Sequence, residues 1–157
     1  MTIRIAYFSW KGHTEKVASA LASLLDADLV RIEPLRESGM PGRLLKTLFF
    51  IRSAIKPCPT DLAGIDELII VTPVWAAKLP PYVNEYLSEV SGGMGKPFRV
   101  IAEMAGRGSE GTIAAVRKEL EKKGMHFVSS ATTLEQDVDS GAFMATVEAF
   151  AAGVKKR

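Results

Sequence analysis

Short apolar runs alternate with longer stretches of helical periodicity along almost the whole chain. The run at 67–72, in which apolar residues follow one another almost without a break, is typical of a central strand covered on both faces. The stretch at 14–25 instead places its apolar residues on one side of a helix. By these criteria we predict strands at 3–8, 28–33, 67–72, 97–103 and 126–133, and helices at 14–25, 41–55, 81–90, 109–123 and 142–154.

Because each strand is followed by a helix, the pattern predicts a doubly wound α/β fold, with a parallel sheet, helices on both faces and right-handed crossovers. The 157 residues suit one domain, 1–157, and no internal repeat or low-complexity linker divides them. In open sheets of this kind, a ligand binds beyond the carboxyl ends of the strands, where the strand order reverses. The loops after the strands are therefore the first places to look for chemistry.

Composition and charge narrow the function classes only moderately. Hydrophobic residues make up 47% and charged residues 24%, which indicates a packed core rather than disorder. The net charge of +2 argues neither for nor against nucleic acid, and we expect no such partner. Two histidines and one cysteine, Cys58, argue against a transition-metal site. With no internal disulfide, no secretory signal and no apolar run long enough to cross a bilayer, we expect a cytoplasmic protein.

The loop after the first strand, 9–14, leads straight into a predicted helix. Gly12 lets the backbone curl, so that several N–H groups can point at one position. That position lies at the positive end of the helix dipole, where a phosphate is favoured. The hydroxyls of Ser9 and Thr14 add further donors. An ordinary turn with Thr14 near the helix N-cap would give the same pattern. A Walker loop is excluded, because its spaced glycines and Lys–Ser/Thr pair are missing.

Two further loops carry residues suited to a planar ligand. Trp75 lies on a proline-bounded loop after the third strand, where its face could stack on a flat ring or simply plug the loop against the next helix. Gly106 and Gly108, after the fourth strand, allow close backbone approach to a ligand, although a flexible turn would also contain them.

Three segments resemble, in their order and spacing, the flavin loops of flavodoxin-like proteins: 7–18, 66–75 with the following Pro80 and Pro81, and 106–112. The resemblance covers essentially the whole chain. The resemblance implies a three-layer flavodoxin-like fold with a five-stranded sheet in the order 2-1-3-4-5, and FMN as cofactor. It implies cofactor contacts in three groups: Ser9, Trp10, Lys11, Gly12, His13 and Thr14 around the phosphate; Thr72, Pro73, Val74 and Trp75 along the ribityl chain and ring; and Ala76, Ala77, Lys78, Ala105, Gly106, Arg107 and Gly108 around the ring's polar edge. No catalytic side chain is implied.

The chain departs from the family's pattern in its charges. Lys11 and His13 stand where the family often has Thr or Ser and Asn, and Lys78 and Arg107 also lie on loops that are usually acidic in electron carriers. A cation about 8 Å from the flavin, at an effective dielectric of about 20, contributes on the order of 2 kcal/mol. That energy corresponds to roughly 40 mV for a two-electron couple, so we expect a less reducing flavin.

A second departure is Ala76-Ala77, where carriers commonly have a glycine whose peptide flips. A positive φ costs an alanine on the order of 1 kcal/mol more than a glycine, so we expect little one-electron-reduced flavin. The third loop also lacks an aromatic residue, so that only Trp75 would stack on the flavin and its other face would stay open. In reductases of this fold, an open face serves a nicotinamide or quinone, often beside a partner in a homodimer.

Three functions remain open at this stage. A reductase that passes electrons from NAD(P)H to a quinone or similar acceptor is slightly favoured over a flavodoxin-type carrier between partner proteins; the third is a flavin-free interaction module. The basic segment 31–56 could meet a membrane surface, although such helices more often pack on the sheet and let their charged ends reach solvent. Glu135, Asp137 and Asp139 are predicted to form a solvated loop, because their spacing fits no calcium motif.

Overall fold

The structure, a computed structural model, describes residues 1–36, 41–42, 45 and 52–156. In this part of the chain, parallel strands form one sheet in the order β2-β1-β3-β4-β5, as the family resemblance implied. The strands are β1 (Ile3–Tyr7), β2 (Asp28–Arg31), β3 (Glu67–Pro73), β4 (Pro97–Met104) and β5 (His126–Leu134). The helices are α1 (His13–Leu25), α3 (Pro81–Glu89), α4 (Ser109–Glu121), α5 (Glu135–Ser140) and α6 (Phe143–Lys155).

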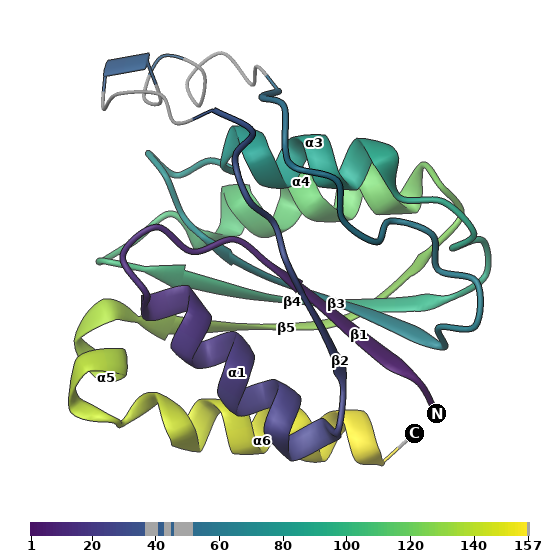
Figure 1. The fold of residues 1–157 in the computed structure, drawn as a ribbon. Coiled ribbons are helices and arrows are strands. Elements are labelled where there is room, and N and C mark those ends of the chain that lie inside the picture. The colour runs from purple at the N-terminus through teal and green to yellow at the C-terminus, as the bar shows by residue number, and fades with distance from the viewer. Residues whose placement is uncertain (37–40, 43–44, 46–51, 157) are drawn as a thin grey trace.

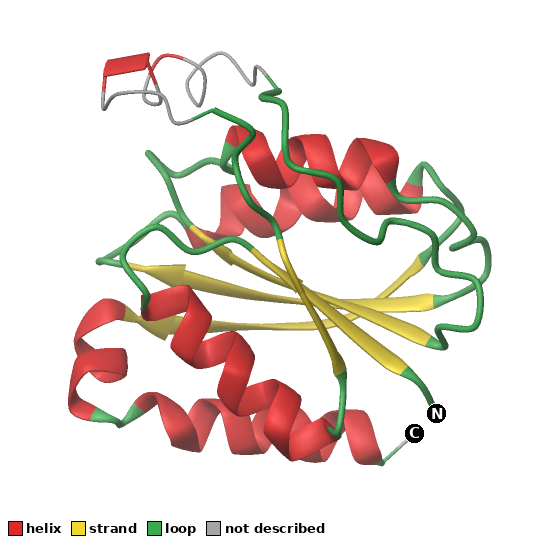
Figure 2. Ribbon diagram, in the orientation of Figure 1, coloured by secondary structure: helices red, strands yellow, loops and turns green. Residues whose placement is uncertain are grey.

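Helices cover both faces of the sheet, which gives three layers (Figures 1 and 2). On one face, α3 and α4 pack against alternate strand residues such as Leu68 and Ile70, and on the other, α1 and α6 pack against Ile69 and Val71. Every residue of β3 is buried for this reason. The unbroken apolar run at 67–72 therefore marked a central strand correctly.

The strand order reverses at β1, which pairs with β2 on one side and β3 on the other. The chain leaves β1 for α1 and leaves β3 for α3, which lie on opposite faces of the sheet (Figure 1). A crevice at the carboxyl ends of the strands is expected where such connections diverge. The same carboxyl edge of the sheet continues at β4, because Pro73 at the end of β3 pairs with Glu103 near the end of β4.

Two predictions about elements need comment. The helix predicted at 41–55 falls mostly outside the described residues. Phe49, Phe50 and most of the central residues of the basic segment 31–56 also lie outside them. The loop predicted for 135–139 is wrong, because these residues form α5, although Asp139 is exposed to solvent as predicted. Val138 of α5 is buried in the cluster that α1 and α6 form, and this packing makes the segment helical. None of the described helices has both the length and the apolar character needed to cross a membrane.

Candidate functional site

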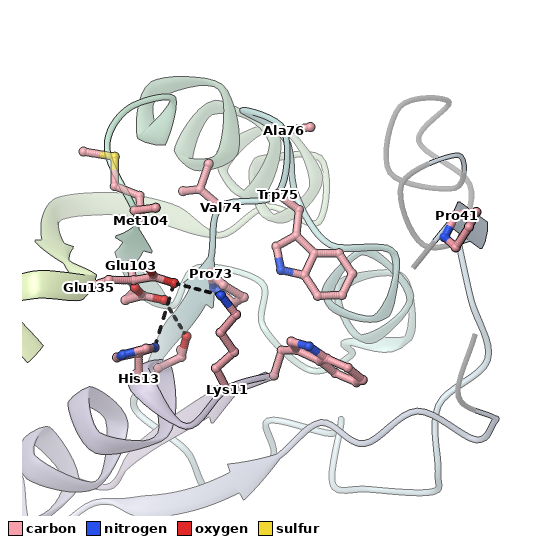
Figure 3. A pocket seen from close by; sticks show the side chains of 13 residues that line it. Lys11, His13, Pro41, Pro73, Val74, Trp75, Ala76, Glu103, Met104 and Glu135 are labelled. Carbon is pink, nitrogen blue, oxygen red and sulfur yellow. Dashed lines mark hydrogen bonds and ion pairs between the residues drawn. The ribbon is translucent and has the colours of Figure 1, made fainter. Parts of the chain in front are cut away.

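A cavity of about 630 Å³ opens at the carboxyl edge of the sheet (Figure 3). All three predicted loops contribute to its wall, together with residues that the sequence did not single out. Its lining is Trp10, Lys11, His13 and Thr14 after β1; Pro41; Pro73, Val74, Trp75 and Ala76 at and after the end of β3; Glu103, Met104 and Ala105 at the end of β4; and Glu135 at the start of α5.

The first loop leaves the amino end of α1 open toward this cavity. Gly12 precedes the helix in the left-handed conformation, with φ of 97°, and its N–H donates to Ser9 Oγ at 3.1 Å. No described side chain caps the helix, so the N–H groups of its first turn are available to an anion. Thr14 is the second residue of α1 and thus lies near the N-cap, as one alternative predicted, but its buried hydroxyl does not cap the helix and donates to Glu103 Oε2 at 3.2 Å.

The second loop contains a tight two-residue turn. Trp75 and Lys78 exchange both backbone hydrogen bonds, at 3.0 and 2.8 Å, and Ala76 and Ala77 between them have φ values of 49° and 59°. A turn of this type requires positive φ at both central residues and usually contains Asn-Gly. Ala76 and Ala77 therefore already adopt the conformation that is costly for alanine, within the paired backbone of Trp75 and Lys78. The expectation of little one-electron-reduced flavin stays a prediction.

Trp75 is fixed by an aromatic cluster while one side of its ring faces the cavity (Figure 3). Its ring meets Phe8 edge-on at 5.4 Å and Tyr82 of α3 at 6.3 Å, between ring centroids. Trp75 thus packs against α3, as one of the two alternatives predicted, and it also lines the cavity, so that its stacking on a planar ring stays a prediction. Trp10, which is 41% exposed, lines the same cavity, so a second aromatic side chain is available there.

The third loop supports the second loop more than it forms the cavity. A Cβ added at Gly108 would lie 2.7 Å from Ala77 Cβ, and one added at Gly111 would lie 2.6 Å from Ala77 O. These two glycines let the turn at 75–78 lie directly on the start of α4. Of the predicted contacts, Ser9, Gly12, Thr72, Ala77, Lys78, Gly106, Arg107 and Gly108 are not part of the cavity lining.

A cluster of charged side chains forms one wall of the cavity. Figure 3 shows Glu103 and Glu135 next to each other, with Lys11 and His13 pointing toward them. Glu135 Oε1 lies 3.9 Å from His13 Nδ1 and 4.0 Å from Lys11 Nζ, and His13 Nε2 lies 2.9 Å from Asp139 Oδ1. The acidic stretch predicted to be solvated therefore supplies two groups to the site.

Glu103 is the most buried carboxyl group of this cluster, with 4% of its surface exposed. Thr14 occupies Oε2, while Oε1 has no hydrogen-bond partner among the described residues. Burial raises the pKa of Glu103 above its ordinary value, and the charge of Glu135 adds to this; the Thr14 hydrogen bond, His13 and Lys11 act in the opposite direction. Sequence reasoning missed Glu103, although a glutamate near the end of the apolar strand 97–103 was a usable signal.

In buffer containing EDTA, we expect Glu103→Gln to gain stability over the wild type as the pH rises. A carboxyl group with a raised pKa contributes stability that is fully present below its ordinary value of 4.5 and is lost as the pH rises through the folded-state pKa. Glutamine does not titrate, so the variant does not show this loss. The loss is about 1.4 kcal/mol for each tenfold difference in the proton affinity of Glu103 between the folded and unfolded states. Urea unfolding between pH 4 and 8 measures it, with the exposed Glu110→Gln as control. A pH-independent difference between wild type and variant would contradict the assignment.

No protein-family model matches the chain, and no curated protein is similar to it in sequence. Solved structures are similar in fold. A flavoprotein from Lactobacillus acidophilus, crystallised in complex with FMN, superposes with a TM-score of 0.73 at 18% identity, covering 88% of this chain and 97% of that one. A candidate flavoprotein from Bacteroides eggerthii gives 0.72 at 21% identity, covering 94% and 98%. A flavodoxin, WrbA-like protein from Agrobacterium tumefaciens gives 0.60 at 16% identity, covering 97% and 98%. The chain has the flavodoxin-like fold.

Proposed function

We propose that this chain is a cytoplasmic redox protein that binds one FMN in the cavity. With this FMN it passes electrons from NAD(P)H to a quinone or similar small acceptor. The observation that carries the proposal is that the uncapped amino end of α1 and the anchored face of Trp75 border the same cavity. An anion site and an aromatic platform are the two features that a phosphorylated planar ring requires. The flavoprotein from Lactobacillus acidophilus, which is similar in fold, was crystallised with FMN.

The residues of the cavity fit the two ends of FMN differently. The backbone N–H groups at the amino end of α1 would hold the phosphate, and the Lys11 ammonium would add positive charge beside it. Trp75 would hold the ring on one side, and Trp10 offers a second aromatic surface. When bound, FMN supplies reversible one- and two-electron transfer, which no ordinary side chain of the cavity provides.

The chain's own contribution to electron transfer is positional. Phe8 and Tyr82 hold the Trp75 ring in place, and α4 supports the adjacent turn through Gly108 and Gly111. Lys11, 66% exposed, lies on the rim, where it favours negative charge on a bound ligand. Hydride transfer to a flavin needs no side-chain acid or base, so a nicotinamide need only reach the open part of the cavity.

The first experiment adds FMN to the purified protein, removes unbound flavin by gel filtration and records the visible spectrum. We expect one FMN per chain with a perturbed spectrum, and rapid bleaching when NADH or NADPH is added without oxygen, followed by reoxidation by a quinone. A bound flavin that ignores both nicotinamides and accepts electrons only from dithionite or light would indicate a carrier. A chain that retains no flavin would favour the remaining function, that of a flavin-free interaction module.

Replacing Trp75 by Ala is expected to weaken FMN binding about tenfold, because stacking of a planar base on an aromatic side chain contributes roughly 1–3 kcal/mol. Quenching of FMN fluorescence on titration with protein gives the dissociation constant. Met94→Ala is the control, because Met94 is 83% exposed at the opposite edge of the sheet and its replacement should leave the dissociation constant unchanged. Urea unfolding of both variants separates stacking from lost packing against Phe8 and Tyr82. Equal FMN affinity in both variants would contradict the assignment.

A further inference from the structure

Among the residues that the structure describes, the charged groups at this wall of the cavity are more negative than positive. Glu103 and Glu135 line the cavity, Asp139 lies behind them beside His13 with its side chain 64% exposed, and Lys11 contributes one ammonium group. The amino end of α1 adds only about half a positive charge. If all three carboxyl groups are ionised and His13 is neutral, two negative charges remain to be balanced by something other than Lys11.

The carboxyl group of Glu103 has one oxygen without a partner. Glu103 is only 4% exposed and lines the cavity, and its buried Oε1 contacts no hydrogen-bond donor among the described residues. Buried polar atoms without a partner are rare in folded proteins and call for an explanation, of which a bound ion is one. One ligand atom each from His13, Glu103 and Glu135 lie within 4.8 Å of one another.

We propose that His13, Glu103 and Glu135 bind one divalent transition-metal cation on this wall of the cavity. The three side chains come from the start of α1, the end of β4 and the start of α5, so the fold brings together residues from segments remote in sequence. Two ligands about 2.1 Å from one tetrahedral ion lie about 3.4 Å apart. Side-chain movements of roughly 1 Å would close the observed spacing to that value.

The geometry of His13 matches that of a metal-binding imidazole. Ligating histidines usually donate their other ring N–H to a carboxylate, which fixes the tautomer and the ring orientation. Nε2 lies 2.9 Å from Asp139 Oδ1, while Nδ1 faces Glu135 at 3.9 Å. Asp139 is therefore a positioning residue, and Nδ1 is the nitrogen left for the metal. The low number of histidines and cysteines does not limit such a site, because carboxylates supply two of its ligands.

The ligand set also indicates the class of metal. One imidazole and two carboxylates suit Zn²⁺ or Mn²⁺ better than Mg²⁺, which prefers oxygen ligands and near-ideal octahedral geometry. Lys11 does not block the site, because its side chain is 66% exposed and its ammonium can move into solvent. An ion here would leave coordination positions open toward the cavity, where a phosphate or another anionic group could complete them.

The test uses the flavin-free full chain in chelator-treated buffer near pH 7.5, titrated with ZnCl₂ in a calorimeter. We expect one Zn²⁺ per chain, with affinity at least tenfold lower in Glu103→Gln and in His13→Gln, and about tenfold lower in Asp139→Asn. Cys58→Ser and His126→Gln are the matched controls for adventitious binding, and both should bind like the wild type. MnCl₂ followed by loss of the free-ion EPR signal provides a second probe, and MgCl₂ at the same concentration should show much weaker binding.

Thermal unfolding with and without ZnCl₂ separates a lost ligand from a lost fold. The wild type and both controls should melt at a higher temperature with Zn²⁺, while Glu103→Gln and His13→Gln should melt cooperatively at a temperature that Zn²⁺ does not change. Absence of Zn²⁺ binding at 0.1 mM, binding retained in both ligand variants, or binding lost in either control overturns the proposal. Because FMN is absent throughout, a chain that binds Zn²⁺ and rejects FMN contradicts only the proposed function, and the reverse result contradicts only the metal site.

Discussion

Replacing Arg99 by Met is expected to lower the free energy of unfolding by about 3–5 kcal/mol, because it leaves the Glu67 carboxylate buried without its partner. Arg99 of β4 and Glu67 of β3 form an ion pair at 2.6 Å, with side chains 5% and 1% exposed. Arg99 also donates to Ser129 Oγ of β5 at 2.8 Å and to the Gly153 carbonyl of α6 at 3.1 Å. One side chain thus connects three neighbouring strands with the helix that covers them.

Urea unfolding measures this loss of stability, and two further variants serve as comparisons. Arg31→Met removes an exposed pair, Arg31–Glu15 at 3.0 Å, and should cost less than about 1 kcal/mol because solvent screens both charges. The double variant Glu67→Leu/Arg99→Met should recover most of the stability, since an apolar pair of similar volume removes the unpaired charge. If Arg99→Met costs no more than Arg31→Met, the buried pair does not have the role assigned to it.

The strands could be predicted because they have a local apolar signal, whereas their order in the sheet came from the family resemblance. Residues 68–71 are apolar on both faces of the sheet, and the structure buries both faces of β3. Where the signal is weak, the prediction was wrong: the acidic stretch 135–139 is polar at most positions, and its helical state depends on burying Val138 against α1 and α6. That contact joins segments remote in sequence, so no local pattern indicates it.

The site shows the same division between local and tertiary causes. The loops at 9–14 and 72–78 were predicted to border one cavity, and they do, because their motifs lie at the ends of adjacent strands. Glu103 was missed although its place near the end of an apolar strand was a usable signal. Glu135 was assigned to a solvated loop because its contacts with Lys11 and His13 join segments remote in sequence. The positive φ of Ala76 and Ala77 could not be predicted from these residues, since intrinsic alanine preference disfavours it and the paired backbone around them overrides that preference.

Gly111→Ala is expected to destabilise the protein by about 1–3 kcal/mol, which is the opposite of the usual effect of alanine in a helix. The new Cβ would lie 2.6 Å from Ala77 O, and that oxygen belongs to a tight turn that has no side-chain rotamer with which to avoid it. The turn at 75–78 must therefore move away from α4. Because Trp75 is the first residue of this turn, we also expect FMN binding to weaken by about tenfold, an effect that rests on the proposed function.

The matched control is Gly153→Ala on α6. A Cβ at Gly153 would have Arg99 Nη1 as its nearest neighbour at 3.8 Å, which is an ordinary contact, so this variant should gain about 0.5–1 kcal/mol and leave FMN binding unchanged. Unfolding and flavin titration on both variants distinguish two kinds of coupling. Loss of stability and of FMN affinity together in Gly111→Ala means that α4 holds the turn and Trp75 in position. Stability lost with affinity intact would mean that the ring is positioned by Phe8 and Tyr82 alone, and a gain equal to that of Gly153→Ala would contradict the close contact itself.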